Sequence, residues 1–262
     1  MLARPELFDA LYSVVDADTP ALIEEILHLR YKAYCLEHPW LDPNDYPDGL
    51  ERDGFDDVAI HIALIHRRSR AVVGGVRLVL PEGDGGIDTL PIVELAPPAT
   101  RPLLSGLPAR RTAEVSRFAV SKAFREAVVK DRSRCGAAAG GRHREVERML
   151  MPYATLGLMR GIERHARRHG ITHLCAVMEP ALMRLLARIG LRFTSLGEPI
   201  AFFGVRQPCF MEIAPCRAAV REASAFGYAV ITAAPNPAAA MALPAATARQ
   251  NTPYETGVEA AA

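Results

Sequence analysis

The stretch that decides the fold is RTAEVSRFAVSKAFR, residues 111–125. Its first ten residues contain Val115, Phe118 and Val120, and β-branched and aromatic residues of this kind favour a buried β-strand. Glu114 and Arg117 interrupt the apolar residues. Because a buried charge costs free energy unless it is paired or has a task, this strand predicts a site where charges meet.

Two more arginines interrupt apolar patterns closer to the N-terminus. Residues 20–37 (PALIEEILHLRYKAYCLE) have the apolar period of an amphipathic helix, and Arg30 stands at an apolar position. Residues 58–81 (VAIHIALIHRRSRAVVGGVRLVLP) predict a hairpin of two strands, and Arg77 lies within the second. Arg30 alone also fits the edge of the helix, with its stem buried and its head in water.

The segment between this helix and the hairpin is acidic. Residues 37–57 hold eight Asp and Glu residues against one base, Arg52. The planar guanidinium group of arginine binds carboxylates through paired hydrogen bonds. We therefore expect residues 51–57 (ERDGFDD) to supply carboxylates to the arginines in a shared electrostatic cluster.

The rest of the chain predicts a mixed α/β fold. Residues 81–110 are rich in Pro and Gly and are expected to be irregular. The other expected elements are a first strand at 11–17, helices at 152–170, 180–190 and 218–227, a strand at 172–179 and further strands within 191–215. This order fits a mostly antiparallel sheet with helices on its faces.

Composition excludes several classes of function. The net charge of +1 gives no sign of nucleic-acid binding. No apolar run approaches the ~20 residues of a membrane helix, and the N-terminus lacks the pattern of a signal peptide, so a cytoplasmic protein is expected. The five cysteines have no CxxC spacing, and His165 and His169 lie outside an HExxH motif, so neither disulfides nor a metal site is expected.

The expected domain organisation is simple. Residues 1–234 are interpreted as one domain with a basic, flexible insertion at about 126–148. Residues 122–148 hold eight Lys and Arg against four acids, a local net charge of +4. Residues 235–262 are rich in Ala and Pro with little to bury, which predicts a disordered tail.

Four blocks of sequence, in this order, resemble a known family. LRYKAYCLE, LERDGFDD, VGGVRLVLP and AEVSRFAV are similar to the signature series of acyl-homoserine-lactone (autoinducer) synthases, which are N-acyltransferases of the GNAT fold. EVSRFAVSKAFR, AVMEPALMRLLARIGLRF and GVRQPCF more closely resemble the PEP-CTERM/exosortase system-associated acyltransferases. The resemblance covers roughly residues 8–215. It implies a GNAT fold, an acyl thioester donor and an amine acceptor, and long-chain N-acyl amino acid synthases belong to the same wider set.

The resemblance also implies roles for individual residues. Glu114 matches the glutamate of the family strand and is the candidate general base. The remaining charged signature positions match Arg30, Asp53, Asp56, Arg77 and Arg117. Trp40, Phe118 and Val120 are the apolar candidates for the acyl or acceptor cavity, although such residues also fit ordinary core packing. A β-bulge near Val115–Phe118, another family feature, would bring Glu114 and Arg117 towards one side and free a backbone N–H for the oxyanion.

The donor is expected to be an acyl thioester, on acyl carrier protein or on CoA. The strand runs into SKAFREAVVK without the Gly-rich pyrophosphate loop of acetyl-CoA-binding GNAT proteins, which weakens acetyl-CoA as the donor. The basic segment Lys122–Arg148 could dock an acidic carrier protein by charge steering, and it also fits a solvated loop. No permanently bound cofactor is expected.

Three functions remain open at this level. The first is an N-acyltransferase in which the amine attacks the thioester directly, since no GxSxG motif or Cys/His arrangement offers a nucleophile. The second is an autoinducer synthase that uses S-adenosylmethionine. The third is a non-catalytic module that binds acyl thioesters, and replacement of Glu114 by Gln would separate it from an enzyme.

Overall fold

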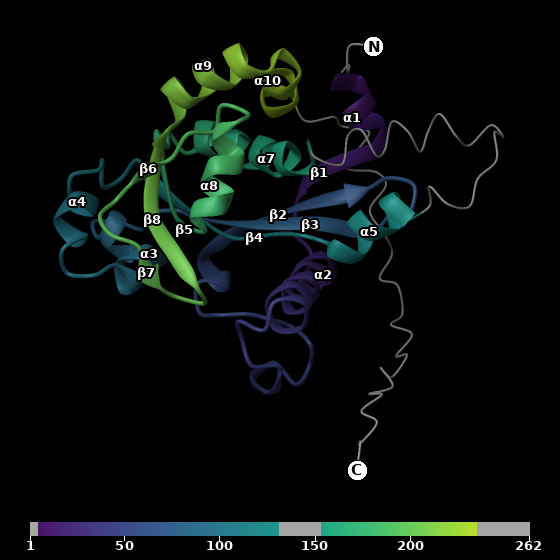
Figure 1. Ribbon diagram of the computed structural model, residues 1–262, viewed down its shortest axis with the longest axis horizontal. Coiled ribbons are helices and arrows are strands. Elements are labelled where there is room, and N and C mark those ends of the chain that lie inside the picture. Colours follow the sequence, from purple (N-terminus) through teal and green to yellow (C-terminus); the bar gives the residue numbers. More distant parts are fainter. Residues whose placement is uncertain (1–4, 131–152, 235–262) are drawn as a thin grey trace.

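The strands form a mixed, mostly antiparallel sheet in a computed structural model that describes residues 5–130 and 153–234. Seven strands follow the order β1-β2-β3-β4-β5-β8-β6, and β7 pairs with β8 beside them (Figure 1). Their bounds are β1 Tyr12–Asp16, β2 Ala59–His66, β3 Val72–Val79, β4 Thr112–Val120, β5 His173–Met178, β6 Thr194–Ser195, β7 Ile200–Ala201 and β8 Val205–Glu212. Among the strand pairs within the described residues, β4–β5 is the one parallel pair.

Helices cover both faces of this sheet. The bounds of the main ones are α1 Pro5–Leu11, α2 Pro20–Tyr31, α5 Lys122–Lys130, α7 Ala154–Arg168, α8 Pro180–Ala187, α9 Ile213–Ala223 and α10 Ala225–Thr232. A π-helical segment, η1 Lys32–Glu37, continues α2. Figure 1 shows α7 on one side of β2 and β3 and α2 on the other. The predicted α/β architecture is confirmed.

The two faces of β2 explain why both sides carry helices. Ile62 and Leu64 join the main hydrophobic core with α7, whereas Ala63 and Ile65 join a smaller cluster with Ile26 of α2. Side chains of a strand alternate between faces, so the nearly continuous apolar run of β2 serves two layers. The strand is therefore buried on both sides.

The β3–β4 pairing contains the bulge that carries Arg117. Gly75 pairs with Ala119, and Arg77 pairs with Ser116. The partners are thus two positions apart on β3 but three positions apart on β4, so β4 contains one extra residue. Arg117 has φ +52°, in the left-handed region that is uncommon outside glycine. The bulge lies within the predicted range Val115–Phe118 and confirms that prediction.

The sheet splays next to the bulge. The parallel β4–β5 ladder ends where Glu114 pairs with Cys175, although β4 continues to Val120. Residues beyond Glu114 therefore have a neighbouring strand on one side only.

The prediction that residues 81–110 are irregular is wrong in part. They contain η4 Ile87–Thr89, α3 Pro91–Leu95 and α4 Arg101–Ser105. Ile87, Leu90 and Ile92 bury against Val79 and Cys175 in a separate apolar cluster. Proline at the first turns of α3 and α4 starts these short helices instead of breaking them.

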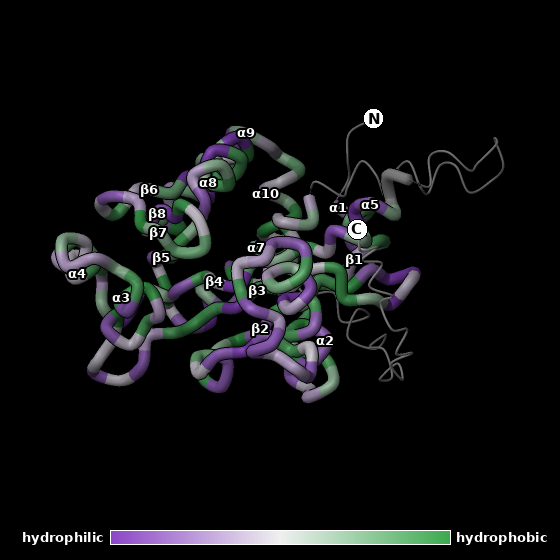
Figure 2. The backbone as a smooth tube through the Cα atoms, turned by 60° about the horizontal axis from the view of Figure 1, so that its bottom comes forward, coloured by the Kyte–Doolittle hydropathy of each residue, from purple (hydrophilic) through white to green (hydrophobic). Residues whose placement is uncertain are grey.

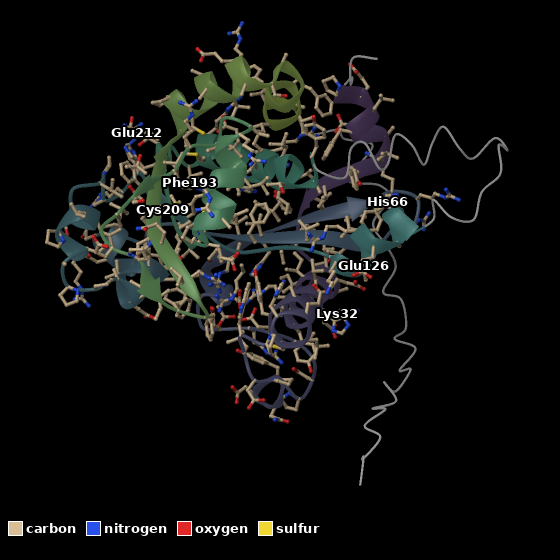
Figure 3. The ribbon with its side chains drawn as sticks, in the orientation of Figure 1. Lys32, His66, Glu126, Phe193, Cys209 and Glu212 are labelled. Atoms are coloured by element: carbon tan, nitrogen blue, oxygen red, sulfur yellow. The ribbon has the colours of Figure 1, made fainter. Side chains whose placement is uncertain are left out.

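The basic segment after β4 also differs from the prediction. Its start is not a loop, because residues Lys122–Lys130 form α5. The ring of Phe124 in α5 lies 4.9 Å from the ring of His66 at the end of β2. Figure 3 shows His66 beside α5. Apolar packing of this helix against the sheet accounts for its order. The rest of the predicted insertion, and the predicted tail, lie outside the described residues.

The C-terminal part contains two helices where one was predicted. Hydrophobic and hydrophilic residues alternate along α9 (Figure 2). Its buried residues Ile213, Cys216 and Val220 are three and four positions apart, which places them on one face. Ser224 caps the next helix, α10, by accepting a hydrogen bond from Gly227 N–H.

In the part of the chain that the structure describes, no helix is long and apolar enough to span a bilayer. The four cysteines of that part, Cys35, Cys175, Cys209 and Cys216, are buried free thiols.

Candidate functional site

Six charged side chains form a closed ring in which arginines and carboxylates alternate. This ring, called the charge cluster below, runs in the order Arg30, Glu51, Arg117, Asp53, Arg77 and Asp56 and closes on Arg30. Its six N···O distances lie between 2.5 and 3.0 Å. Each arginine thus bridges two carboxylates, and each carboxylate bridges two arginines.

The charge cluster has a closed side and an open side. The side chains of Arg30, Glu51 and Arg77 are at most 2% exposed. Those of Arg117 and Asp53 are 22% and 29% exposed. A small polar molecule can therefore reach Arg117 and Asp53, while the buried members hold them in place.

The two aspartates of the cluster are ionised. Burial by itself would raise the pKa of Asp56, but hydrogen bonds and charge from Arg30, with the charge of Arg77, bring it down to about 2. Burial opposes ionisation of Asp53 too, and Arg77 and Arg117 hold its pKa below the ordinary value. The two aspartates therefore carry negative charge between their arginine partners.

Local backbone structure presents the two aspartates. The Asp56 carboxylate accepts a hydrogen bond from Asp53 N–H at 2.8 Å, and the Asp53 carboxylate accepts one from Phe55 N–H at 2.9 Å. Arg77 Nε donates to Ser116 Oγ at 3.0 Å, which ties β3 to β4. The turn therefore orients its carboxylates before any ligand arrives.

Glu51 is the member of the cluster that sequence reasoning did not single out. It is fully buried and binds both Arg30 and Arg117. The signal was present, since Glu51 belongs to the ERDGFDD segment and lies two residues before Asp53. Residues 37–57 contain eight acids, and no local feature of the sequence indicated which of them bind the arginines.

Glu114 lies beside the charge cluster without joining it. Its side chain is buried, and Oε2 accepts a hydrogen bond from Ile92 N–H at 2.6 Å. Burial raises the pKa of Glu114 to about 8, against the opposing effects of that hydrogen bond and of Arg77 and Arg117. A carboxyl group with this pKa can exchange a proton near neutral pH.

Cys175, the register partner of Glu114 on β5, is a poor nucleophile. Burial and the nearby Glu114 raise the pKa of its thiol. Because the thiolate is the reactive form, Cys175 acts here as a small apolar residue.

Trp40 connects this site to the far side of the splayed sheet. Its ring lies 5.8 Å from the ring of Tyr34, and the guanidinium carbon of Arg206 on β8 lies 4.5 Å from its centroid. Arg206 also binds Glu179, which directly precedes α8, at 2.7 Å. Trp40 therefore packs between Tyr34 and Arg206 and does not belong to the hydrophobic core clusters of the described residues.

The structure also gives the packing of the other two predicted lining residues. Phe118 and Val120 are half-buried and pack against the main hydrophobic core. Beyond the bulge their side chains belong to the α7 face of the sheet. The charge cluster itself brings together the predicted Arg30, Asp53, Asp56, Arg77 and Arg117.

A separate apolar pocket lies within the main core, where α7, β5, β8, α9 and α10 meet. Leu174, Met211 and Val220 contribute to its walls, and no member of the charge cluster does. The described residues contain no group of three or more His, Cys, Asp or Glu that could hold a metal ion.

Residues 29–132 match the acetyltransferase (GNAT) domain family. The matched region begins in α2, ends just past α5 and contains the whole charge cluster and Glu114. No curated protein sequence matches the chain. The match and the fold support an acyltransferase.

Solved structures of acyl-homoserine lactone synthases share the fold. LasI has 17% sequence identity and a TM-score of 0.53, covering 81% of this chain and 94% of its own. The CoA-dependent synthase BjaI, solved with SAM and isopentyl-CoA, has 20% identity and a TM-score of 0.55, with 81% and 87% covered. TofI, solved with an inhibitor and MTA, has 20% identity and a TM-score of 0.52, with 80% and 96% covered. At these identities the likeness concerns the fold, and the predicted GNAT fold is confirmed.

Proposed function

We propose that the protein is an N-acyltransferase that moves a fatty acyl group from an acyl thioester to the amine of a small, amino acid-like acceptor. The observation that carries the proposal is Glu114, a buried carboxyl group outside the ion pairs of the charge cluster, with a pKa of about 8. A carboxylate serving only as an ion-pair partner would be bound to one of the arginines and would ionise well below neutrality.

The reaction needs no nucleophilic side chain. Glu114 takes a proton from the acceptor ammonium, and the freed nitrogen lone pair attacks the thioester carbonyl carbon. The carbonyl π electrons move to oxygen, and when they return the C–S bond breaks. The thiolate leaves with its electron pair and takes up the proton held by Glu114, while the nitrogen, which became positively charged on bonding to carbon, loses its second proton to solvent to give the neutral amide.

The open side of the charge cluster suits an amino acid-like acceptor. Arg117 can bind a carboxylate through its planar fork, and Asp53 can bind an ammonium group. Both lie at the exposed edge of the cluster and within the electrostatic reach of Glu114. An acceptor held this way would present its amine next to the base.

An autoinducer synthase is the second candidate. S-adenosylmethionine carries the same amino acid group as a free amino acid, so the charge cluster suits both acceptors. BjaI, which shares the fold, was solved with SAM and isopentyl-CoA. The sequence blocks that resemble the PEP-CTERM/exosortase-associated acyltransferases favour the amino acid-like acceptor, and we assign the chain to that system on this resemblance.

The donor and location complete the proposal. The acyl group comes from acyl carrier protein or CoA, with no permanently bound cofactor, and the protein works in the cytoplasm. The basic segment Lys122–Arg148 is the proposed docking site for an acidic carrier protein. Lys122 and Arg125 of α5 contribute to it within the described residues.

The deciding experiment compares wild-type protein with Glu114→Gln. Purified wild-type protein, given acyl-CoA or acyl carrier protein with amino acids or S-adenosylmethionine, should form an N-acyl product detectable by mass spectrometry. Because catalysis requires the ionised base, kcat/KM should rise with pH to a plateau above about 8. Glu114→Gln should lower kcat by about 10²–10⁴-fold.

Glu94→Gln is the matched control, because Glu94 is exposed on α3 and should leave turnover unchanged. A lactone product would favour the autoinducer synthase. Thioester binding without turnover in wild-type protein would identify a non-catalytic module and refute the proposed enzyme.

A further inference from the structure

Tyr34 is held rigidly by an unusual backbone segment. It lies in η1, and short π-helical segments of this kind often mark functional sites. The Tyr34 carbonyl accepts hydrogen bonds from Trp40 N–H at 3.0 Å and Leu41 N–H at 3.1 Å. Its ring lies 5.8 Å from the ring of Trp40, at an interplanar angle of 25°. Both the backbone and the ring of Tyr34 are thus fixed.

The hydroxyl group of Tyr34 lies in the field of the charge cluster. Burial raises its pKa to about 12, and the charges of Arg117, Arg30, Glu51 and Arg77 also act on it. The group is therefore a neutral O–H at any working pH. Arg117 also acts on Glu114, so it lies within reach of both groups.

This hydroxyl has no hydrogen-bond partner among the described residues. The nearby acids Glu51, Asp53 and Asp56 form ion pairs with the arginines of the cluster. Tyr34 is half-buried and its hydroxyl is not sealed from its surroundings, so a bound molecule can reach it. An uncommitted donor at this place points to an acceptor on a bound molecule.

We propose that the Tyr34 hydroxyl donates a hydrogen bond to the carbonyl oxygen of the bound acyl thioester and stabilises the oxyanion that forms on it. The inference rests on the proposed function and adds a catalytic residue to it. In the proposed function, the acceptor molecule binds Arg117 and Asp53 through its charged groups. The neutral hydroxyl of Tyr34 is then available to bind the thioester carbonyl.

The hydrogen bond strengthens during the reaction. As the amine nitrogen bonds to the carbonyl carbon, the π pair localises on oxygen, where Tyr34 O–H meets a full negative charge. When the C–S bond breaks, the carbonyl reforms and the hydroxyl keeps its proton throughout. A donor fixed before the charge appears needs no reorganisation in the transition state.

Tyr34→Phe tests this role, because it removes only the oxygen and keeps the ring against Trp40. We expect kcat to fall by about 10²-fold, with the KM for the thioester changed by less than about 3-fold. The control is Tyr31→Phe, three residues earlier, whose ring stacks on His28 at 6.4 Å. A Tyr34→Phe enzyme within about 3-fold of the wild-type kcat would overturn the proposal.

The pH profile separates this role from a structural one. Loss of an oxyanion donor should lower the rate by the same factor at every pH and leave the inflection of Glu114 in place. A shifted inflection would mean that Tyr34 only maintains the charge cluster, which also contradicts the proposal.

A binding measurement separates failure of this inference from failure of the proposed function. Two unreactive acyl-CoA analogues serve as probes: a ketone, with sulfur replaced by methylene, and a thioether without the carbonyl. Tyr34→Phe should weaken binding of the ketone and leave the thioether unaffected, whether or not the protein turns over. If Tyr34→Phe affects binding of both analogues equally, the proposed contact with the carbonyl is refuted. If only ketone binding weakens but the wild-type protein shows no turnover, the contact stands and the proposed reaction is refuted.

Discussion

At the scale of single residues, the charge cluster depends on every member. Buried charges are tolerated when each has an oppositely charged partner nearby. Removal of one partner leaves an unpaired charge in a buried, poorly solvated position. Glu51 is the most consequential acid, because it is fully buried and binds both Arg30 and Arg117. It also links α2 to β4 through the acidic segment.

Glu51→Gln should therefore lower the free energy of unfolding by about 3–5 kcal/mol. The neutral amide keeps the shape of the side chain but leaves Arg30 and Arg117 short of a negative partner. Urea unfolding followed by the fluorescence of Trp40, the single tryptophan in the chain, measures the change.

The control for this prediction is Asp48→Asn. Asp48 pairs with Arg52 at the surface, with both side chains more than 40% exposed, so its loss should change stability by about 0.5 kcal/mol or less. Equal unfolding midpoints for the two variants would show that the ring of ion pairs does not stabilise the fold.

At the scale of elements, close packing decides how α7 meets the sheet. A Cβ atom added at Gly157 of α7 would lie 2.5 Å from Phe8 Cζ and 3.0 Å from a methyl group of Leu64. Both neighbours are fully buried, so neither can move freely. This glycine, the fourth residue of α7, lets the helix approach β2 and α1 closely.

Gly157→Ala should destabilise the protein by about 1–3 kcal/mol. The expected overpacking exceeds the gain of at most about 1 kcal/mol that alanine brings to a helix. Thermal unfolding followed by circular dichroism tests this, with Gly54→Ala as the control, since a Cβ there would meet nothing within 4 Å. A Gly157→Ala variant more stable than the wild type would contradict the packing argument.

At the scale of the whole molecule, the stability of the folded protein in acid depends on the charge cluster. The pKa values of Asp53 and Asp56 are lower in the folded protein than their ordinary value of 3.8, so protons bind the unfolded chain more tightly. Their contribution to stability is full above about pH 4 and is lost as the pH falls towards 2. The cluster should weaken in acid before the apolar cores do.

Asp56→Asn should be less stable than the wild type at pH 7, and the difference should shrink between pH 4 and pH 2. Urea unfolding at a series of pH values measures both quantities. Asp57→Asn, at the neighbouring exposed position, should follow the wild-type curve. A constant difference between Asp56→Asn and the wild type across this range would refute the linkage.

The sequence by itself determined the elements and the kinds of residue at the site. Periodicity located α2, the β2–β3 hairpin, β4 and α7, because these patterns are local and each reports one element. It also marked Arg30, Arg77 and Arg117 as charges in apolar surroundings. The irregular prediction for residues 81–110 failed because their order comes from packing against Val79 and Cys175 rather than from a repeating pattern.

Only the tertiary structure decided which groups meet. Arg30 and Glu51 are 21 residues apart, and Glu51 and Arg117 are 66 apart, so no local pattern could pair them. The elevated pKa of Glu114 requires its burial, which packing against distant segments produces. Burial and hydrogen bonding depend on packing between distant segments, and a linear sequence carries that information only through the fold.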